Sequence, residues 1–439
     1  MNTLDKLRAG GVVGGGGAGF PTWKKLSAPA DTLLVNGAEC EPLLQSDQYL
    51  MLHEAEALVR AAWELGQTVG AKRMVIALKD HYHAQREALE QAIARLQLPV
   101  ELHDLPTVYP VGDEQSVVFE CTGRAVPPRG LPGSVGCTVV SVSTTLNAGR
   151  ALADVPVTRR LVTVAGEVAN PGLYDVPIGT SIPEVLAAAG GITTDTPRIL
   201  LGGPMMGALQ TDPEHAVVTK TCGGVLVFDD RHLLVNRARL TIEQMRSRAR
   251  SCCIQCRSCT DLCPRYLLGH PIYPHLTMRG FGSGAPAEPS AILCMECGVC
   301  ELFACPMGLS PRRIQQLEKE ELRKAKANPS FAMVETQRET RPWRQAPSGR
   351  IALRVDVARY AFDTPATVTT VAPHTVRIPL KQHIGAPATA TVRVGDSVRA
   401  EQLIGQMAPD ALGADVHASI DGQVTEVTDY VTISGEAGV

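Results

Sequence analysis

The sequence predicts a multidomain α/β protein, and three observations support this fold class. With 439 residues, the chain is longer than a single hydrophobic core usually organises. Its first third alternates short apolar runs with helical patterns, whereas its last part consists of Val- and Thr-rich runs separated by glycines. Between these parts, nine cysteines crowd between Cys252 and Cys305. We therefore expect several folded units in series.

The composition favours a globular protein and argues against two other classes. Apolar residues make up 44% of the chain, charged residues 20%, and the net charge is −3, so the basic footprint of a nucleic-acid-binding protein is missing. No run of eighteen apolar residues occurs, and Lys6 and Arg8 are followed by glycines where a signal peptide needs an apolar segment. We expect a cytoplasmic protein without a membrane span or a nucleic-acid partner.

Residues 1–155 are predicted to form an α/β domain with a mainly parallel sheet. The apolar runs 32–35 and 74–78 have the length of buried strands, and helical patterns follow at 50–65 and 84–96. Strands that alternate with helices in this way are typical of parallel sheets, since the helices form the crossover connections.

Residues 156–238 are predicted to form a compact, β-rich module. Short β runs at 161–164 and 216–218 are separated by turns that contain glycine and proline. One short helix is expected around residues 182–189.

Three further segments complete the predicted organisation. Residues 239–328 are cysteine-rich and end in a charged helix at 311–326, where Glu and Lys recur at helical spacing. Residues 329–349 are polar and contain several prolines, which is typical of a linker. Residues 350–439 are rich in Val and Thr with near-regular glycine turns, which predicts a small all-β sandwich or barrel.

Two cysteine motifs are the strongest functional signal. The first is Cys253-x2-Cys256-x2-Cys259-x3-Cys263-Pro264, and the second is Cys294-x2-Cys297-x2-Cys300-x4-Cys305-Pro306. Three cysteines at this spacing direct their thiolates at one 4Fe-4S cluster, while the fourth reaches the other cluster. The motifs predict two 4Fe-4S clusters in a helical segment like a bacterial ferredoxin. By this crossing rule, one cluster takes Cys253, Cys256, Cys259 and Cys305, and the other takes Cys263, Cys294, Cys297 and Cys300.

Structural zinc is the alternative for these cysteines, because paired Cys-x2-Cys units also form four-cysteine zinc sites. Zinc would leave the third closely spaced cysteine of each motif without a use. The second motif has one more residue before Cys305 than the bacterial pattern, and the x2 spacing leaves out the adjacent Cys252. The remaining cysteines are isolated, so we expect them to be small buried side chains.

A glycine-rich tract near the start is a candidate cofactor site. Gly14, Gly16, Gly17 and Gly19 follow a short apolar stretch, and Lys25 comes soon after. Bare glycines let backbone amides approach a phosphate or a flat ring, and a lysine can meet its negative charge. The tract matches neither a Walker loop nor a dinucleotide fingerprint, so a flexible linker is the alternative.

Three polar residues follow the predicted strand 32–35 directly. Asn36, Glu39 and Glu41 lie just beyond its carboxyl end. Open α/β sheets bind their ligands at that edge, so these residues are candidates for the same site as the glycine tract.

These motifs resemble a known family. Gly-Gly-Ala-Gly-Phe-Pro at 16–21, followed by Asn-Gly-Ala-Glu-Cys-Glu-Pro at 36–42, is similar to the NADH- and FMN-binding subunit of respiratory complex I and, more closely, to the C subunit of the Rnf electron-transport complex. The resemblance continues through Tyr109-Pro-x-Gly112-x-Glu114, the run from Thr138 to Leu146, and Gly202-Gly203-Pro204-Met205-Met206-Gly207. The last motif lies in a module that resembles a soluble-ligand-binding β-grasp domain.

The resemblance implies that the first domain binds FMN and takes NADH as electron donor. It places FMN against the 16–19 loop, with Lys25 as a flavin-contacting lysine and Asn36 beside the flavin. Glu39 and Glu41 would line the flavin–nicotinamide site as catalytic residues, and the further candidates for cofactor binding are Gly14, Gly16, Gly17, Gly19, Glu114 and Thr145. The chain departs from the complex I protein at Gly15, where that protein has an arginine.

The segments 263–270 and 305–312 look most like the cobalamin reductases of propanediol-utilisation bacterial microcompartments. The domain order agrees, since the run from Gly395 to Val424 resembles a barrel-sandwich hybrid at the C-terminal end. This resemblance implies reduction of cob(II)alamin to cob(I)alamin inside a microcompartment, with an adenosyltransferase and a cluster-carrying shell protein as candidate partners. No Asp-x-His-x-x-Gly sequence is present, so we expect cobalamin to bind transiently or on a partner.

Two other functions fit the same motifs. An Rnf-type electron-transfer protein would use the same cofactors but pass its electrons to other redox proteins that pump ions. A non-catalytic iron–sulfur scaffold would lack the flavin.

Overall fold

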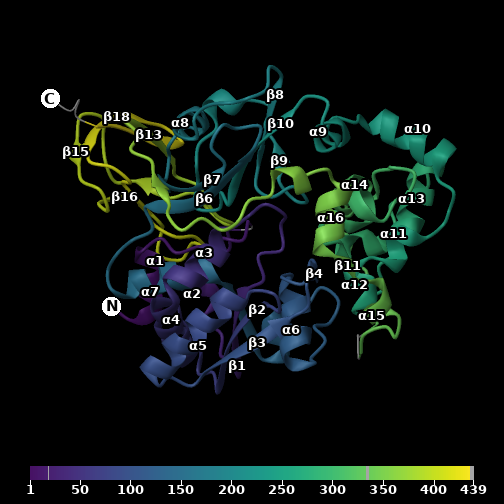
Figure 1. The fold of residues 1–439 in the computed structure, drawn as a ribbon, viewed down its shortest axis with the longest axis horizontal. Coiled ribbons are helices and arrows are strands. Elements are labelled where there is room, and N and C mark those ends of the chain that lie inside the picture. Colours follow the sequence, from purple (N-terminus) through teal and green to yellow (C-terminus); the bar gives the residue numbers. More distant parts are fainter. Residues whose placement is uncertain (18, 333–335, 436–439) are drawn as a thin grey trace.

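The computed structural model describes residues 1–17, 19–332 and 336–435 (Figure 1). Its first domain contains a four-stranded sheet in the order β3-β2-β1-β5, and every neighbouring pair in it is parallel, as predicted. The strands are β1 (Thr32–Gly37), β2 (Arg73–Lys79), β3 (Val100–Leu105) and β5 (Cys137–Ser141). The helices are α1 (Thr3–Ala9), α2 (Thr22–Lys25), α3 (Ser46–His53), α4 (Ala55–Val69), α5 (His83–Leu96), α6 (Glu114–Thr122) and α7 (Val142–Leu152).

Both faces of this sheet are buried, which explains the continuous apolar runs in its strands. Leu33 and Val35 point to the cluster formed with α3, α4, α5 and α7, whereas Leu34 points to the cluster formed with α6. This alternation follows from the two-residue period of a strand. Helix α4 ends at Gly70, whose φ of 70° suits glycine.

The second module is built on a six-stranded mixed sheet in the order β12-β7-β6-β10-β8-β9. Its strands are β6 (Arg159–Gly166), β7 (Gly172–Pro177), β8 (Pro197–Leu201), β9 (Ala208–Leu209), β10 (Gly224–Asp229) and, from the C-terminal part, β12 (Thr369–Thr370). Helix α8 (Ile182–Ala188) forms where it was expected, with a capping box between Ser181 and Glu184. The expected β run at 216–218 forms only an isolated bridge between Ser181 and Val217.

The cysteine-rich segment is helical, with short helices around the cysteines (Figure 1). Helix α9 (Leu233–Ala238) precedes it, and its own α-helices are α10 (Ile242–Cys252), α11 (Ser258–Asp261), α12 (Pro264–Leu267), α13 (Pro274–Ser283) and α14 (Pro311–Lys324). A 3-10 turn (Pro289–Leu293) precedes the second motif, and a π turn (Val299–Phe303) lies within it. Helix α14 is the predicted charged helix, and it buries Ile314 and Leu322.

The segment 329–349, predicted to be a linker, contains regular structure and contacts the first domain. It includes α15 (Arg341–Arg344) and β11 (Ala346–Pro347), and β11 pairs with β4 (Val108–Tyr109) of the first domain. Helix α16 (Ser348–Arg354) follows, and its Ile351 packs in one cluster with Phe228 of the second module. Proline is compatible with a short edge strand, so the prolines did not exclude this pairing. Residues 333–335 of the predicted linker lie outside the described residues.

From Thr375 onward the C-terminal module is all-β, as predicted, and consists of two small sheets in the orders β13-β19-β18-β15 and β14-β16-β17. Residues 350–354 of the segment predicted to be all-β instead belong to helix α16, and β12 joins the sheet of the second module. Its strands are β13 (Thr375–Pro379), β14 (Thr389–Ala390), β15 (Ser397–Val398), β16 (Leu403–Gln406), β17 (Val416–His417), β18 (Gly422–Val427) and β19 (Tyr430–Ser434). Val376 and Ile404 belong to the same apolar cluster as Leu7 and Leu33, so this module packs directly on the first domain. No helix among the described residues is long and apolar enough to cross a membrane.

Candidate flavin site and cysteine cavities

The glycine tract forms a loop that is held at its base and open at its tip. The Gly14 amide donates to the Phe20 carbonyl at 2.9 Å, and the Gly15 amide donates to the Thr144 hydroxyl at 2.9 Å. A Cβ at Gly16 or Gly17 would meet no heavy atom within 4 Å, and Gly17 has a φ of 113° that suits glycine. Ala18 lies outside the described residues. The loop therefore offers a cradle that a flat ring or a phosphate can approach closely.

The loop lies at the topological switch point of the first sheet. The chain runs from β1 to β2 and β3 on one side, while β5 pairs with the other side of β1. Ligands of open α/β sheets bind at the carboxyl ends of the strands where the order reverses in this way. Asn36 lies at the end of β1, where its amide donates to the Gly112 carbonyl at 2.7 Å and its oxygen accepts from Ala38 at 3.1 Å.

Lys25 and Glu114, both predicted to bind the cofactor, form an ion pair. The Lys25 ammonium also donates to the Val139 carbonyl at 3.0 Å, which fixes it beside β5. The side chains are 27% and 43% exposed, so the pair can be reached from solvent. A ligand phosphate or ring could therefore exchange contacts with Lys25 without breaking the core.

Glu39 is partly buried and contacts the start of α3. Its carboxylate accepts the backbone N–H groups of Asp47 and Gln48, each at 3.1 Å. Burial, together with the negative charge of the nearby Asp47, raises the pKa of Glu39 to about 7. Glu39 can therefore change its protonation state near neutral pH.

Glu41 has different partners from those its position in the sequence led us to expect. Its carboxylate accepts the Met205 amide at 2.8 Å, from the Gly-Gly-Pro-Met-Met-Gly loop of the second module. A Cβ at Gly203 would overlap this carboxylate, so the glycine is required for the close approach. Burial raises the pKa of Glu41 to about 7. In the structure Glu41 joins two modules, and its role in the flavin–nicotinamide site remains a prediction.

Two residues at the glycine loop were missed from the sequence. Thr145, the predicted candidate, is fully buried and its hydroxyl donates to the Ser141 carbonyl at 2.9 Å, whereas the neighbouring Thr144 bonds to the loop. Arg160, on β6 of the second module, donates to the Gly15 carbonyl at 3.0 Å. A Cβ at Gly15 would lie 2.8 Å from the Arg160 guanidinium. Arg160 thus occupies the space beside Gly15, and its distance along the chain left no local sequence signal for it.

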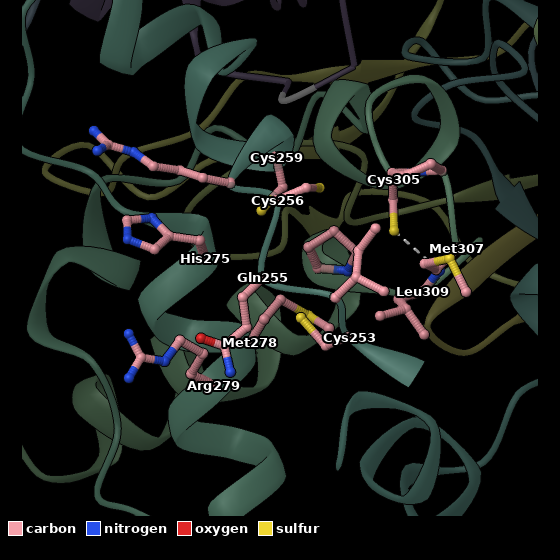
Figure 2. Close-up of a pocket in the computed structure, with 14 residues that line it drawn as sticks. Cys253, Gln255, Cys256, Cys259, His275, Met278, Arg279, Cys305, Met307 and Leu309 are labelled. Carbon is pink, nitrogen blue, oxygen red and sulfur yellow. Dashed lines mark hydrogen bonds between the residues drawn. The ribbon is translucent and has the colours of Figure 1, made fainter. Parts of the chain in front are cut away.

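Four cysteines from both motifs surround one cavity of about 250 Å³, which we call the outer cavity (Figure 2). They are Cys253, Cys256, Cys259 and Cys305. Cys253 and Cys256 come from the loop between α10 and α11, Cys259 lies in α11, and Cys305 comes from the end of the second motif (Figure 2). Cys256 is exposed, so this cavity opens to solvent.

The other four cysteines line a second, smaller space, which we call the inner cavity. They are Cys263, Cys294, Cys297 and Cys300. The cysteines thus share the two cavities in the crossed pattern that the spacing predicts. Among the described residues, no three His, Cys, Asp or Glu side chains converge on a position for a single metal ion. Two separate sets of four thiols are the donor set that two 4Fe-4S clusters require.

Direct contacts link the inner cavity to the first domain. The Tyr109 hydroxyl donates to the Cys297 carbonyl at 2.7 Å, and Arg265, two residues after Cys263, pairs with Asp113 at 2.7 Å. Arg312, which also lines this cavity, donates to the Met205 carbonyl. Tyr109 and Asp113 belong to the segment that contacts Asn36 through Gly112. Judged by these hydrogen bonds and this ion pair, the inner cavity is nearer than the outer cavity to the candidate flavin site.

Four family models match successive parts of the chain. They are described as the Nuo51 FMN-binding domain (residues 7–150), the SLBB domain (161–209), the 4Fe-4S dicluster domain (252–310) and the RnfC barrel sandwich hybrid domain (361–438). The glycine loop falls within the first of these matches and all eight cysteines fall within the third. The chain is a flavoprotein reductase that uses FMN and 4Fe-4S clusters for electron transfer.

The chain is also similar to individual curated proteins and to a solved structure. The chain is 33% identical over 263 residues to the C component of the Na+-translocating ferredoxin:NAD+ oxidoreductase complex of Acetobacterium woodii, covering 58% of this chain and 56% of that protein. Among solved structures, an NAD+-reducing NiFe hydrogenase in the H2-reduced state has a TM-score of 0.49 and 22% identity, covering 75% of this chain and 62% of that one. The cobalamin reductase PduS of Salmonella typhimurium is 44% identical over 436 residues, covering 97% of this chain and 94% of that protein. The chain therefore belongs to the family of the PduS cobalamin reductases.

Proposed function

We propose that the chain takes electrons from NADH at the first domain and passes them through the two cysteine-rich cavities to cob(II)alamin, which becomes cob(I)alamin. The observation that carries this proposal is the link from Asn36, at the carboxyl end of β1, to Gly112, and from Tyr109 of the same segment to Cys297 of the inner cavity. The 44% identity with PduS over nearly the whole chain supports cobalamin as the acceptor.

The residues present fit the cofactors that the proposal requires. The open side of Gly16 and Gly17 suits a flat ring, and Lys25 lies beside the sheet edge as a cation. Each cavity offers four thiols. When bound, FMN accepts a hydride equivalent from NADH and releases electrons singly, and 4Fe-4S clusters carry single electrons.

The protein's own residues would hold and orient the reactants. The loop amides and Lys25 would meet the phosphate, and Arg160 would fix the loop from behind. Glu39 would present a carboxyl group whose protonation changes near neutral pH, so it can accept or donate a hydrogen bond to the nicotinamide.

The contacts of the two cavities suggest an order of transfer. The inner cavity touches the first and second modules through Tyr109, Arg265 and Arg312. The outer cavity contains the exposed Cys256. Electrons would therefore enter at the inner cavity and leave from the outer one.

The acceptor is expected to arrive from outside. The sequence lacks an Asp-x-His-x-x-Gly motif for holding cobalamin, so a transient complex or delivery by an adenosyltransferase fits better. We place this reaction inside a propanediol-utilisation microcompartment, where a cluster-carrying shell protein is a second candidate partner.

The test is anaerobic reduction of cobalamin by the reconstituted protein. NADH, cob(II)alamin and an adenosyltransferase with ATP are supplied, and adenosylcobalamin formation is measured by its visible spectrum. We expect formation that requires both NADH and the protein, and Glu39→Gln should slow the oxidation of NADH while flavin remains bound. Glu64→Gln, an exposed residue on α4, is the matched control.

Two outcomes would contradict the proposal. If NADH bleaches the flavin and a protein electron carrier is reduced, but cobalamin is not, the chain acts as an Rnf-type relay. If the purified protein holds clusters but no flavin after reconstitution with FMN, it is an iron–sulfur scaffold.

A further inference from the structure

We propose that the surface around the outer cavity is a docking site for a redox protein that presents an acidic face. The inference rests on the proposed function, because it assigns the partner chemistry of the outlet. Its physical basis is the charge, the exposed apolar side chains and the accessibility of this one rim.

Arginines supply the positive charge at the rim. Arg257 and Arg279 line the outer cavity and are exposed, whereas no Asp or Glu is among the described residues that line it. Figure 2 shows Arg279 and His275 on the side of the cavity opposite Cys305. The chain as a whole carries a net charge of −3, so this rim is positive against the overall balance.

Further arginines extend the positive charge to the Cys305 side. Arg248, on α10, donates to the Gly308 carbonyl at 3.1 Å, and Arg354 donates to the Cys305 carbonyl at 3.4 Å. Two acids lie nearby: Asp261 is 3.3 Å from Arg257, and Glu288 lies near His275. Arg279 forms no salt bridge with any described residue, so its charge is available to a partner.

The inner cavity provides a contrast within the same segment. There Arg265 is paired with Asp113, and Lys319 is paired with Glu296 at 2.7 Å. Arg265 and Lys319 are thus paired with acids of the chain and Arg312 donates to the Met205 carbonyl, whereas Arg279 at the outer rim is exposed and forms no salt bridge with a described residue. If these positive side chains served only to offset the negative charge of a cluster, both cavities would show the same pattern. Charge compensation therefore does not explain the difference between the two cavities.

Two large apolar side chains at the rim are exposed. Ile254 is 61% exposed and Met307 is 42% exposed, and both line the outer cavity. They come from the loops that hold Cys253 and Cys305. A small apolar patch surrounded by one sign of charge suits the brief, electrostatically guided encounters of electron-transfer proteins, which use small interfaces. The exposed Cys256 lets such a partner approach the redox centre closely.

The test measures binding of an acidic probe, a plant-type 2Fe-2S ferredoxin in its oxidised form, to the reconstituted protein by calorimetry under nitrogen. The rim variant is Arg257→Glu with Arg279→Glu. The matched control is Arg393→Glu with Arg399→Glu, two exposed arginines of the C-terminal module with the same change in charge. Because Arg257 pairs with Asp261, the single variant Arg279→Glu is included to avoid disturbing the cysteine loop.

We expect the rim variant to raise the Kd for ferredoxin by about tenfold or more, and the control by less than about twofold. Binding to the unchanged protein should weaken as ionic strength rises from about 20 to about 200 mM, with a smaller effect in the rim variant. Iron and sulfide content and flavin bleaching by NADH should be the same in all variants.

Equal weakening in the rim and control variants would overturn the proposal, as would an unchanged Kd accompanied by a shifted cluster potential. Rim-dependent binding of duplex DNA or of anionic vesicles without binding of ferredoxin would also overturn it. If ferredoxin binds as expected but no cobalamin is reduced, the docking site is retained and the proposed acceptor is wrong.

Discussion

Glu39 and Glu41 stand two residues apart in the sequence, yet the structure gives them different partners. Glu39 accepts backbone amides at the start of α3 in the first domain, whereas Glu41 accepts an amide of the second module. Cys40 lies between them and its sulfur accepts the Gly112 amide at 2.8 Å. The segment 39–41 therefore provides both a carboxyl group for the candidate site and a contact between the first domain and the second module.

The burial of Glu41 predicts a pH-dependent effect of Glu41→Gln. The pKa of this carboxyl group is raised from 4.5 to about 7 in the folded protein, so the folded state binds the proton more tightly. Stability of the unchanged protein therefore falls as pH rises from about 4.5 to about 7, by up to about 3 kcal/mol. Glutamine keeps the acceptor for Met205 but does not ionise.

We expect the apparent Tm of Glu41→Gln, relative to the unchanged protein, to rise by a few degrees between pH 6 and pH 8. Differential scanning fluorimetry at both values measures it, with the exposed Glu64→Gln as the control that should show no such trend. A difference that stays constant with pH would mean that Glu41 is ionised throughout and stabilised by Arg312.

At this scale the sequence predicts residue types better than residue contacts. The eight cysteines divide between the cavities as the spacing indicated, because short loops leave each triplet few directions. Thr144 rather than Thr145 bonds to the glycine loop, because the position of each residue in the first turn of α7 determines which hydroxyl faces the loop. Arg160 lies 145 residues from Gly15, so no local pattern could indicate it.

Among the elements, the glycine loop leaves open space beside its backbone that a ligand could occupy. Gly16 has open space where a Cβ would lie, and its φ is not in the left-handed region. A larger residue there should therefore be tolerated by the fold and should act only on a ligand in the cradle.

Gly16→Val should leave the apparent Tm of the flavin-free protein nearly unchanged but weaken FMN binding by about tenfold or more, because the side chain fills space needed by the ring. Flavin retained after gel filtration and an FMN titration by fluorescence quenching measure this effect. Gly133→Val is the control, since a Cβ at Gly133 also meets nothing within 4 Å. Normal FMN binding by Gly16→Val would place the flavin elsewhere.

The two-residue strands show where prediction of elements fails. Strands β4 and β11 are too short to produce an apolar period, yet their pairing brings the segment after α14 back to the first domain. The longer β1 and β2 were predictable because their apolar patterns extend over whole elements. The single helix predicted at 50–65 is divided at Glu54 between α3 and α4, a break that the apolar pattern did not indicate. The pairing of short strands depends on tertiary packing, which the local sequence does not record.

In the whole molecule, the C-terminal module acts as a clamp on the first two. The Ile384 amide donates to the Gly19 carbonyl at 3.1 Å, at the glycine loop itself. The buried Lys220 of the second module donates to the carbonyls of Gly11 and Asp415, each at 2.8 Å, and so joins three modules. Figure 1 shows the C-terminal strands beside α1 and the second sheet.

Lys220→Met should have an effect that depends on pH. Burial lowers the pKa of Lys220 from 10.5 to about 7, so between about 7 and 10.5 the unfolded chain binds a proton that the folded protein does not. Stability of the unchanged protein therefore rises with pH across this window. The apparent Tm of Lys220→Met should fall relative to the unchanged protein by a few degrees between pH 6.5 and pH 9. Scanning fluorimetry measures it, and Lys381→Met, an exposed lysine of the C-terminal module, should show no such trend.

The order of the two cavities leads to a last prediction, on the route of electrons through the molecule. Because Tyr109, Arg265 and Arg312 tie the inner cavity to the other modules, removal of one inner thiol should interrupt the route before the outer cavity. Cys297→Ala should therefore leave an outer cluster that dithionite reduces but NADH does not. Cys256→Ala should leave an inner cluster that NADH still reduces, while ferredoxin or cobalamin is no longer reduced in turnover.

Electron paramagnetic resonance of samples frozen after addition of NADH or dithionite distinguishes the two variants, and flavin bleaching by NADH should be near normal in both. Iron and sulfide analysis checks that each variant keeps one cluster. If Cys256→Ala blocked reduction of the remaining cluster by NADH while Cys297→Ala did not, the order of the two cavities would be reversed. Electrons would then enter at the exposed rim around Cys256 rather than leave from it.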